Sequence, residues 1–182
     1  MAGHLTVDGG PAQAPGMGNA NGLEIERKWL LASAPSSEWL RAHGAVAKRI
    51  EQVYLRSDGE PGGRRVRRTE TDAGVEHVET RKRARSGFTR EEVERSIGPA
   101  EYAAALVDAE PSRQPVRKTR WVFPYAGHRL ELDVFEIPAG VVLLEIELTS
   151  EDEAVELPPD LPVVREVTDD RAYLNWNLAR RG

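Results

Sequence analysis

The sequence predicts a mainly β (α+β) domain, an eight-stranded antiparallel β-barrel closed into a tunnel, with a charged interior and a few flanking helices. Charged residues alternate with apolar ones in several separate segments, as expected for strands whose two faces meet different surroundings. Most connections between these segments are too short for the crossover helices of a parallel sheet. The 182 residues, 40% of them hydrophobic, suffice for one domain with a buried core.

The clearest alternation lies at 23–31, where Glu24, Glu26 and Lys28 share one strand face and Ile25 and Trp29 share the other. An isolated run of this kind is usually a solvent-exposed strand face. Here, however, paired charges recur at strand spacing further along the chain, at Arg65/Arg67, Glu92/Glu94, Lys118/Arg120, Glu131/Asp133 and Glu145/Glu147. If these faces meet in one barrel interior, the mixed lining suits a metal-bound polyanion better than an apolar ligand.

In chain order, residues 1–21 are rich in Gly, Ala and Pro and predict a disordered leader, so the folded domain is expected to span 22–182. The first strand is followed by a short helix that begins near Pro35 and ends at Gly44. Four further strands are then expected, two of them joined by a hairpin turn at 71–74. These strands are 46–56, 64–68, 75–83 and 88–97.

The second half of the chain is expected to complete the barrel. Pro99 suits a helix start, and the Ala-rich stretch 101–108 predicts a helix. A Ser–Glu capping box predicts a short helix from Ser150 to about Leu157, and a last helix should cover 170–180. The remaining strands are 116–123, 128–137 and 141–150.

Composition excludes several classes of function. The formal net charge of -5 argues against a nucleic-acid-binding protein, because such domains usually carry a basic excess. Without cysteine there is no disulfide, thiolate metal site or thiol nucleophile. No apolar run approaches the roughly 20 residues of a membrane span, and the N-terminus lacks the features of a signal peptide. We therefore expect a cytoplasmic protein that binds neither membranes nor nucleic acid.

The Glu24, Glu26 and Lys28 pattern resembles the opening strand of the CYTH domain, the fold of the triphosphate tunnel metalloenzymes. The likeness covers roughly 23–179 and looks most like the short bacterial members that hydrolyse inorganic triphosphate. It departs from the family at Ala172, where an Arg usually precedes the Tyr, and this leaves any role of Arg171 open. The other matching segments are 52–55, 65–67, 80–82, 90–94, 118–120, 130–135, 144–148 and 166–168.

The resemblance implies metal-dependent hydrolysis of inorganic triphosphate, or another triphosphate, to diphosphate and phosphate. One or two Mg²⁺ or Mn²⁺ ions would be held by oxygen ligands from Glu24, Glu26, Asp133, Glu145 and Glu147. The phosphates would be bound by Arg65, Arg67, Lys82, Arg90 and Arg120. Catalysis would fall to Lys28 and Lys118 as a water-activating pair, with Tyr54 touching the substrate or orienting the lysines.

Several alternatives stay open at this stage. Both lysines could remain charged and bind only phosphate, with the metal activating water. Thiamine triphosphatase and class IV adenylyl cyclase share the same barrel, and a non-catalytic polyphosphate-binding module is a hypothesis of a different class. The partner expected in every case is a triphosphate or polyphosphate-bearing small molecule, and a homodimer is compatible with the sequence.

Overall fold

The computed structural model describes residues 25–57, 62–84 and 90–181, with the backbone alone described at 82–84 and 90–92, so the predicted leader lies outside them. The described chain forms one antiparallel sheet of nine strands in the spatial order β5-β4-β3-β2-β6-β7-β8-β1-β9. The mainly β, antiparallel prediction is therefore confirmed. The strands are β1 Ile25–Leu31, β2 Val46–Tyr54, β3 Arg64–Thr71, β4 Gly74–Ala84, β5 Arg90–Ser96, β6 Val116–Tyr125, β7 His128–Ile137, β8 Val142–Leu148 and β9 Val163–Glu166.

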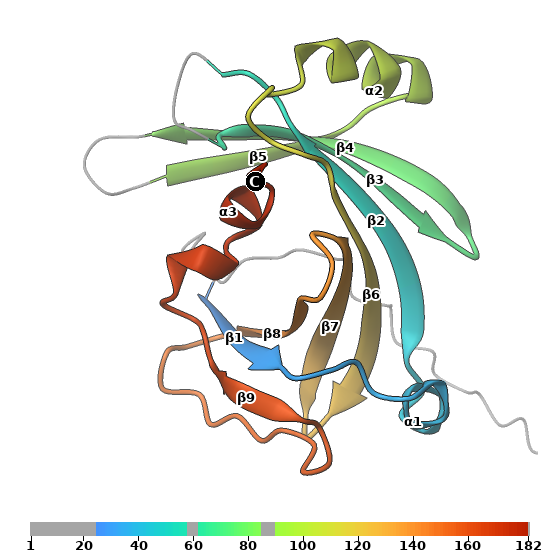
Figure 1. The fold of residues 1–182 in the computed structure, drawn as a ribbon, viewed down its shortest axis with the longest axis vertical. Coiled ribbons are helices and arrows are strands. Elements are labelled where there is room, and N and C mark those ends of the chain that lie inside the picture. Colours follow the sequence, from blue (N-terminus) through green and yellow to red (C-terminus); the bar gives the residue numbers. More distant parts are fainter. Residues whose placement is uncertain (1–24, 58–61, 85–89, 182) are drawn as a thin grey trace, which may run out of the picture.

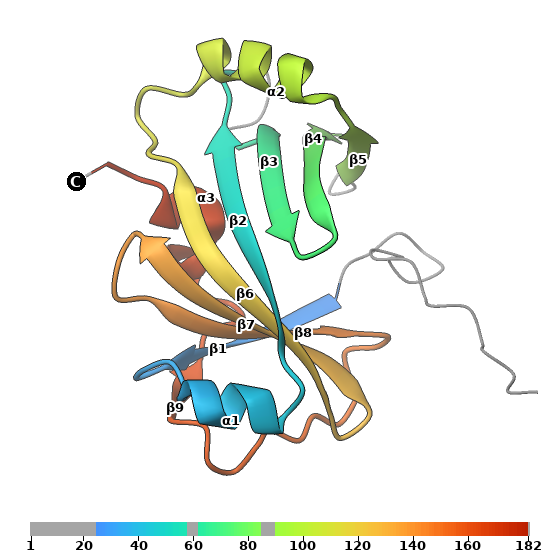
Figure 2. The same cartoon turned by 90° about the vertical axis from the view of Figure 1, so that its right-hand side faces the viewer.

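The sheet is strongly curved, so that β2 to β5 face β1, β8 and β9 across a concave side (Figure 1). Helices α1 (Ser37–Ala42) and α2 (Pro99–Ala105) lie outside this curve, at opposite ends of the molecule (Figure 2). The short α3 (Asn175–Leu178) lies between the two halves (Figure 1). Single-turn 3-10 helices occur at Leu106–Asp108 (η1) and Arg171–Tyr173 (η2). No helix of the described chain is long and apolar enough to cross a membrane.

The apolar half of each alternating strand builds the convex core. Leu40 of α1 packs there with side chains from four strands, and each such side chain stabilises the fold by about 1.5–3 kcal/mol when fully buried. These are Trp29, Phe123, Leu130, Leu132, Leu144, Ile146 and Leu148. A second convex cluster joins Val53, Leu55 and Val66 to Tyr102 of α2. The charged half of the alternation is therefore directed to the concave side.

A third apolar cluster closes one end of the concave side. Tyr54, Val116, Phe135 and Leu143 come from four neighbouring strands and pack with Trp176 of α3 and its flanking residues. The ring of Trp176 lies edge-on to that of Tyr54, with 4.9 Å between centroids. The C-terminal segment therefore packs inside the curve of the sheet, not on its outer surface.

Two predictions about the barrel need correction. The sheet has nine strands, because β9 adds to β1 at the edge that the sequence left without a strand. Over the residues that the structure describes, β5 and β9 are the two edges and no pairing joins them, so the closed eight-stranded barrel is not confirmed. The described backbone pairing is therefore that of an open sheet with free edges at β5 and β9.

Two predicted helices also differ. Residues 150–157 form a bend and a turn followed by irregular chain. The Glu153 carboxylate accepts hydrogen bonds from the backbone N–H and hydroxyl of Thr149, at 2.7 and 2.8 Å, instead of capping a helix. The last helix is broken at Leu174, whose extended backbone (φ -68°, ψ 134°) separates η2 from α3. The predicted helix before Gly44 is confirmed as α1, with Ser36 as its N-cap.

Candidate active site

Strand register places the predicted site residues on one face of the sheet. Opposite residues of paired strands share a face, and the pairing links Tyr54 to Arg65, Arg120 to Asp133, and Glu26 to Glu147. Both Tyr54 and Phe135, the residue opposite Lys118, pack against the C-terminal segment, so this shared face is the concave one. Backbone register assigns Lys82 and Arg90 to the same face, although their side chains are outside the described set. Glu24 also lies outside the described residues.

Lys28 connects the first strand to β8. Its ammonium lies 2.9 Å from Oε1 of Glu26 and 2.9 Å from Oε1 of Glu145, which is directly opposite in the ladder. Burial alone would lower the pKa of Lys28, but the negative charges of Glu145 and Glu26 outweigh it and raise that pKa. Lys28 is therefore held in its charged form between two carboxylates.

Lys118 is more deeply buried than Lys28. Its side chain is only 4% exposed, and its Nζ lies 2.5 Å from Oδ2 of Asp133, which is completely buried. The ring of Phe135 lies 5.0 Å from the same nitrogen. Burial lowers the pKa of Lys118 and outweighs the opposing charge of Asp133. The two lysines thus differ in the direction of their pKa shifts, although they share one sheet face.

Arg120 bonds to a carboxylate partner of each lysine. Its guanidinium donates to both oxygens of Asp133, at 2.6 and 2.7 Å, and to Oε2 of Glu145 at 2.6 Å. The result is a continuous chain of contacts, hereafter the concave network, formed by Glu26, Lys28, Glu145, Arg120, Asp133 and Lys118. Among the contacts described, none joins the two ammonium groups directly.

Two carboxylates of this network, Glu145 and Glu26, have pKa values shifted in opposite directions. Burial opposes ionisation of Glu145, but Lys118, Arg120 and Lys28 outweigh it and lower its pKa to about 2. Partial burial and the charge of Glu145 instead raise the pKa of Glu26. Negative charge is therefore fully compensated at Glu145 and less well compensated toward Glu26, whose side chain is 48% exposed.

One member of the cluster was not among the predicted site residues. Glu131 lies opposite Glu145 in the ladder, accepts a hydrogen bond from Arg120, and contacts Arg129 at 2.6 Å. The sequence carried its signal, because Glu131 and Asp133 flank Leu132 and therefore share a strand face.

The opposite half of the concave face is basic. Arg65 and Arg67 project from β3, and Oε1 of Glu94 lies 4.0 Å from the former and 3.5 Å from the latter. The same oxygen accepts a hydrogen bond of 3.0 Å from Thr80. Tyr54 lies opposite Arg65 in the ladder, beside the apolar cluster around Trp176. Burial raises the pKa of Tyr54 to about 12, so its hydroxyl stays protonated at neutral pH. Strand β3, which carries both arginines, lies across the curve of the sheet from β1 and β8 (Figure 1).

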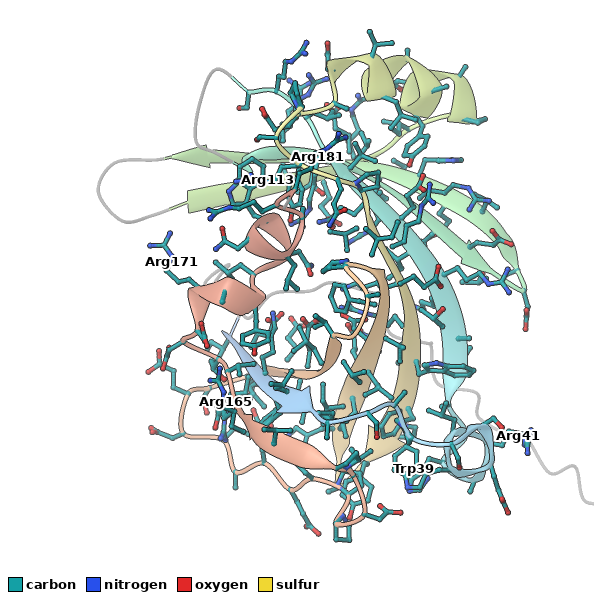
Figure 3. All side chains as sticks on the ribbon, viewed as in Figure 1. Trp39, Arg41, Arg113, Arg165, Arg171 and Arg181 are labelled. Carbon is teal, nitrogen blue, oxygen red and sulfur yellow. The ribbon has the colours of Figure 1, made fainter. Side chains whose placement is uncertain are left out.

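Arg171 is not part of this arrangement. It belongs to η2, is exposed, and points away from the body of the molecule in Figure 3. Arg165, also labelled there, comes from the edge strand β9 and contacts Asp170 at 2.8 Å. Neither guanidinium is directed into the concave side.

The donor set is compatible in kind with a hard divalent cation. Glu26, Glu145 and Glu147 supply only carboxylate oxygens from two paired strands, and burial together with the charge of Glu145 raises the pKa of Glu26. Over the described residues, however, no three carboxylates or histidines converge closely enough to form a metal cage. The ammonium of Lys28 lies between two of the carboxylates.

Comparison with known proteins gives the family. No family model matches the chain. It is 34% identical over 161 residues to the inorganic triphosphatase of Nitrosomonas europaea, a match that covers 86% of this chain and 96% of that protein. A crystal structure of an inorganic triphosphatase superposes with a TM-score of 0.57 at 30% identity, covering 86% of this chain and 94% of the other.

A more distant solved structure supports the fold alone. A protein from Pyrococcus horikoshii superposes with a TM-score of 0.51 at 23% identity, over 71% of this chain and 80% of the other. The ordered CYTH-like segments, the curved antiparallel sheet and the match along most of the chain agree with one another. This chain therefore belongs to the inorganic triphosphatases of the CYTH, or triphosphate tunnel metalloenzyme, family.

Proposed function

We propose that this protein hydrolyses inorganic triphosphate to diphosphate and phosphate on its concave face, with a divalent metal ion as cofactor. The observation that carries the proposal is the concave network, in which three acids and three bases from four strands form one chain of contacts. The 34% identity to an inorganic triphosphatase supports this substrate over thiamine triphosphate or ATP.

The basic half of the concave face suits the substrate's charge. A triphosphate carries several negative charges, and planar guanidiniums can bind phosphate oxygens in pairs. In this proposal Arg65 and Arg67 hold the phosphates from one side, and Arg120 reaches them from the other. Lys82 and Arg90 would extend the basic half, since their strand positions share its face.

The acidic residues nearest β1 would hold the metal ion, Mg²⁺ or Mn²⁺. Glu26, Glu145 and Glu147 are the principal ligands proposed, with Glu24 and Asp133 completing the set. A bound cation would neutralise phosphate charge and polarise the terminal phosphoryl group. Lys28 would turn from these carboxylates toward the phosphate oxygens, because an ammonium and a metal ion compete for the same oxygens.

Water activation is assigned to the buried lysine. The neutral amine of Lys118 would take a proton from the water that attacks the terminal phosphorus, while the bond to the leaving diphosphate breaks. The lowered pKa of Lys118 supports this assignment, and the raised pKa of Lys28 supports a permanently charged partner. Tyr54, protonated at neutral pH, would donate a hydrogen bond to a phosphate oxygen.

The tunnel predicted from the sequence is part of this proposal. Bound triphosphate would bring the two halves of the curved sheet together as the walls of a tunnel. A cytoplasmic location and a homodimer stay predictions from the sequence.

A substrate panel tests the proposal. Triphosphate, ATP and thiamine triphosphate are each incubated with the purified protein, with and without Mg²⁺ or Mn²⁺, while free phosphate and cyclic AMP are measured. We expect phosphate release from triphosphate that requires the added metal. Cyclic AMP as the main product, or binding of triphosphate without turnover, would reject the proposed reaction.

A further inference from the structure

The backbone of Lys28 is held by the segment that follows β9. In the sheet, the N–H and C=O of Lys28 both point away from β8 and toward this segment. The N–H of Val167 donates to the Lys28 carbonyl at 2.7 Å. The N–H of Lys28 donates to the side-chain hydroxyl of Thr168 at 3.0 Å. A side-chain oxygen thus replaces the carbonyl that a continuing strand would have supplied.

The hydroxyl of Thr168 has its orientation fixed. A hydroxyl carries one proton, and that of Thr168 is donated to Oε1 of Glu166 at 2.7 Å, which leaves a lone pair for the Lys28 N–H. Glu166 is itself held by Arg27, whose Nε and Nη2 donate to its two oxygens at 2.8 and 2.6 Å. Arg27, Glu166, Thr168 and Lys28 therefore form a hydrogen-bonded relay from the outer side of β1 to the site.

This relay ends at Lys28, whose ammonium bridges two carboxylates of the concave network. The ammonium of Lys28 lies 2.9 Å from both Glu26 and Glu145, so the position of its backbone determines which oxygens on the concave face it can reach. Thr168 is exposed and belongs to none of the apolar clusters, so packing does not explain its contacts. Its described hydrogen bonds go only to the relay.

We propose that Thr168, oriented by Glu166, is a positioning residue that fixes the backbone of Lys28 and so aims its ammonium into the concave network. The proposal rests on the proposed function for its kinetic consequence, but its structural content can be measured without turnover. Thr168 itself lies beside the backbone of β1 and would act through Lys28, not on the substrate.

Thr168→Val removes the hydroxyl while keeping the shape of the side chain. We expect kcat at saturating triphosphate and metal to fall about tenfold, because one aligned hydrogen bond is lost at a residue that must be accurately placed. KM should stay within about twofold, since the phosphate-binding arginines lie on other strands. Hydrogen exchange of the Lys28 amide, followed by NMR, should accelerate at least about tenfold because its acceptor is gone.

Three variants complete the experiment. Thr168→Ala removes the same oxygen without an added methyl group and should match Thr168→Val. Thr168→Ser keeps the hydroxyl and should restore both kcat and protection of the Lys28 amide. Thr71→Val is the matched control, because Thr71 makes comparable contacts with its own turn, at 3.3 and 3.5 Å, far along the chain from β1. It should leave kcat and the Lys28 amide unchanged.

A Lys28 amide that stays protected in Thr168→Val, or an exposed amide with unchanged kcat, overturns the proposal. Equal losses in Thr168→Ser and Thr168→Val overturn it as well, because the hydroxyl would then not be the group that matters. If the wild-type protein releases no phosphate from triphosphate, the proposed function is rejected separately. Exchange of the Lys28 amide then decides alone for or against positioning by Thr168.

Discussion

Glu145 and Glu79 are two buried carboxylates on opposite faces of the same sheet, each surrounded by cations. Their side chains are 8% and 5% exposed, and the pKa of each is lowered to about 2. Glu145 faces the concave side, whereas Glu79 lies opposite Val66 on the convex side near α2. By charge compensation alone the two could not be told apart.

What distinguishes them is the surroundings of their partners. Glu79 contacts Arg64, Arg81 and Arg95, whose side chains are 25%, 48% and 53% exposed, and two of these also contact surface acids. Glu145 contacts Lys28 and Arg120, which are 10% and 18% exposed and lead on to further acids and to Lys118. A functional centre is thus indicated by several acids and bases that converge in a largely buried region, and not by a single carboxylate whose charge is compensated.

The largest expected effect comes from Lys118→Met, which removes the ammonium but keeps an apolar stem of similar length. If Lys118 accepts the proton of the attacking water, kcat at saturating metal and triphosphate should fall about 10²-fold or more. KM should change much less, because the phosphate-binding arginines remain. Steady-state kinetics with phosphate detection provides the measurement. A variant that lost affinity while keeping kcat would show that Lys118 only binds phosphate.

Glu26→Gln tests whether Glu26, the most exposed carboxylate of the concave network, binds the metal ion. The amide keeps the shape of the carboxylate but lacks the charge that attracts a divalent cation. We expect the Mg²⁺ or Mn²⁺ concentration for half-maximal rate to rise at least about tenfold, since removing even indirect ligand partners costs that much in metal affinity. A titration of rate against metal at saturating triphosphate measures this shift. An unchanged metal requirement would remove Glu26 from the proposed ligand set.

The face assignments behind these predictions could be obtained from sequence because strand periodicity is local. Side chains two residues apart share a face whatever the rest of the fold does, so Glu26 with Lys28 and Lys118 with Arg120 were placed together correctly. Strand β9 was missed because its four residues, Val163–Glu166, are all exposed and therefore show no alternation. Closure of the sheet depends on global curvature, which no local pattern encodes.

Side-chain contacts could not be predicted from the sequence for a related reason. Ser150 and Glu153 have the spacing of a capping box, but the Glu153 carboxylate accepts from Thr149, one residue before Ser150, and bonds to His128, which the tertiary fold brings beside it. The partners of Arg120 likewise come from strands far apart in the chain, so a predicted phosphate ligand also proved to connect two buried carboxylates. Residue types predicted the chemistry, but only the fold determined the pairing.

Glu79→Gln tests the convex carboxylate. Because the folded-state pKa of about 2 is below the ordinary Glu pKa of about 4.3, ionised Glu79 stabilises the fold at pH values above about 4.3. This contribution is lost as the pH falls toward the folded-state pKa. At pH 7 the variant should lose about 1–3 kcal/mol in free energy of unfolding, and the difference from wild type should shrink in acid.

Chemical denaturation at several pH values measures the loss, and kcat per folded molecule should stay close to wild type. A Glu79→Gln variant that was stable but inactive would contradict the distinction between the two faces.

Arg27→Ala is expected to have the smallest effect on turnover, although Arg27 lies between two residues of the concave network in sequence. Its side chain leaves the opposite face of β1 and bonds to Glu166, where both partners are about one-third exposed, at 34% and 39%. Loss of such an exposed pair costs about 0–1 kcal/mol. Glu166 can still accept the Thr168 hydroxyl without Arg27, so kcat should stay within about threefold of wild type. If Arg27→Ala instead lowered kcat as far as Lys118→Met, the convex side of β1 would be carrying the chemistry and the concave face would have been assigned to the wrong side of the strand.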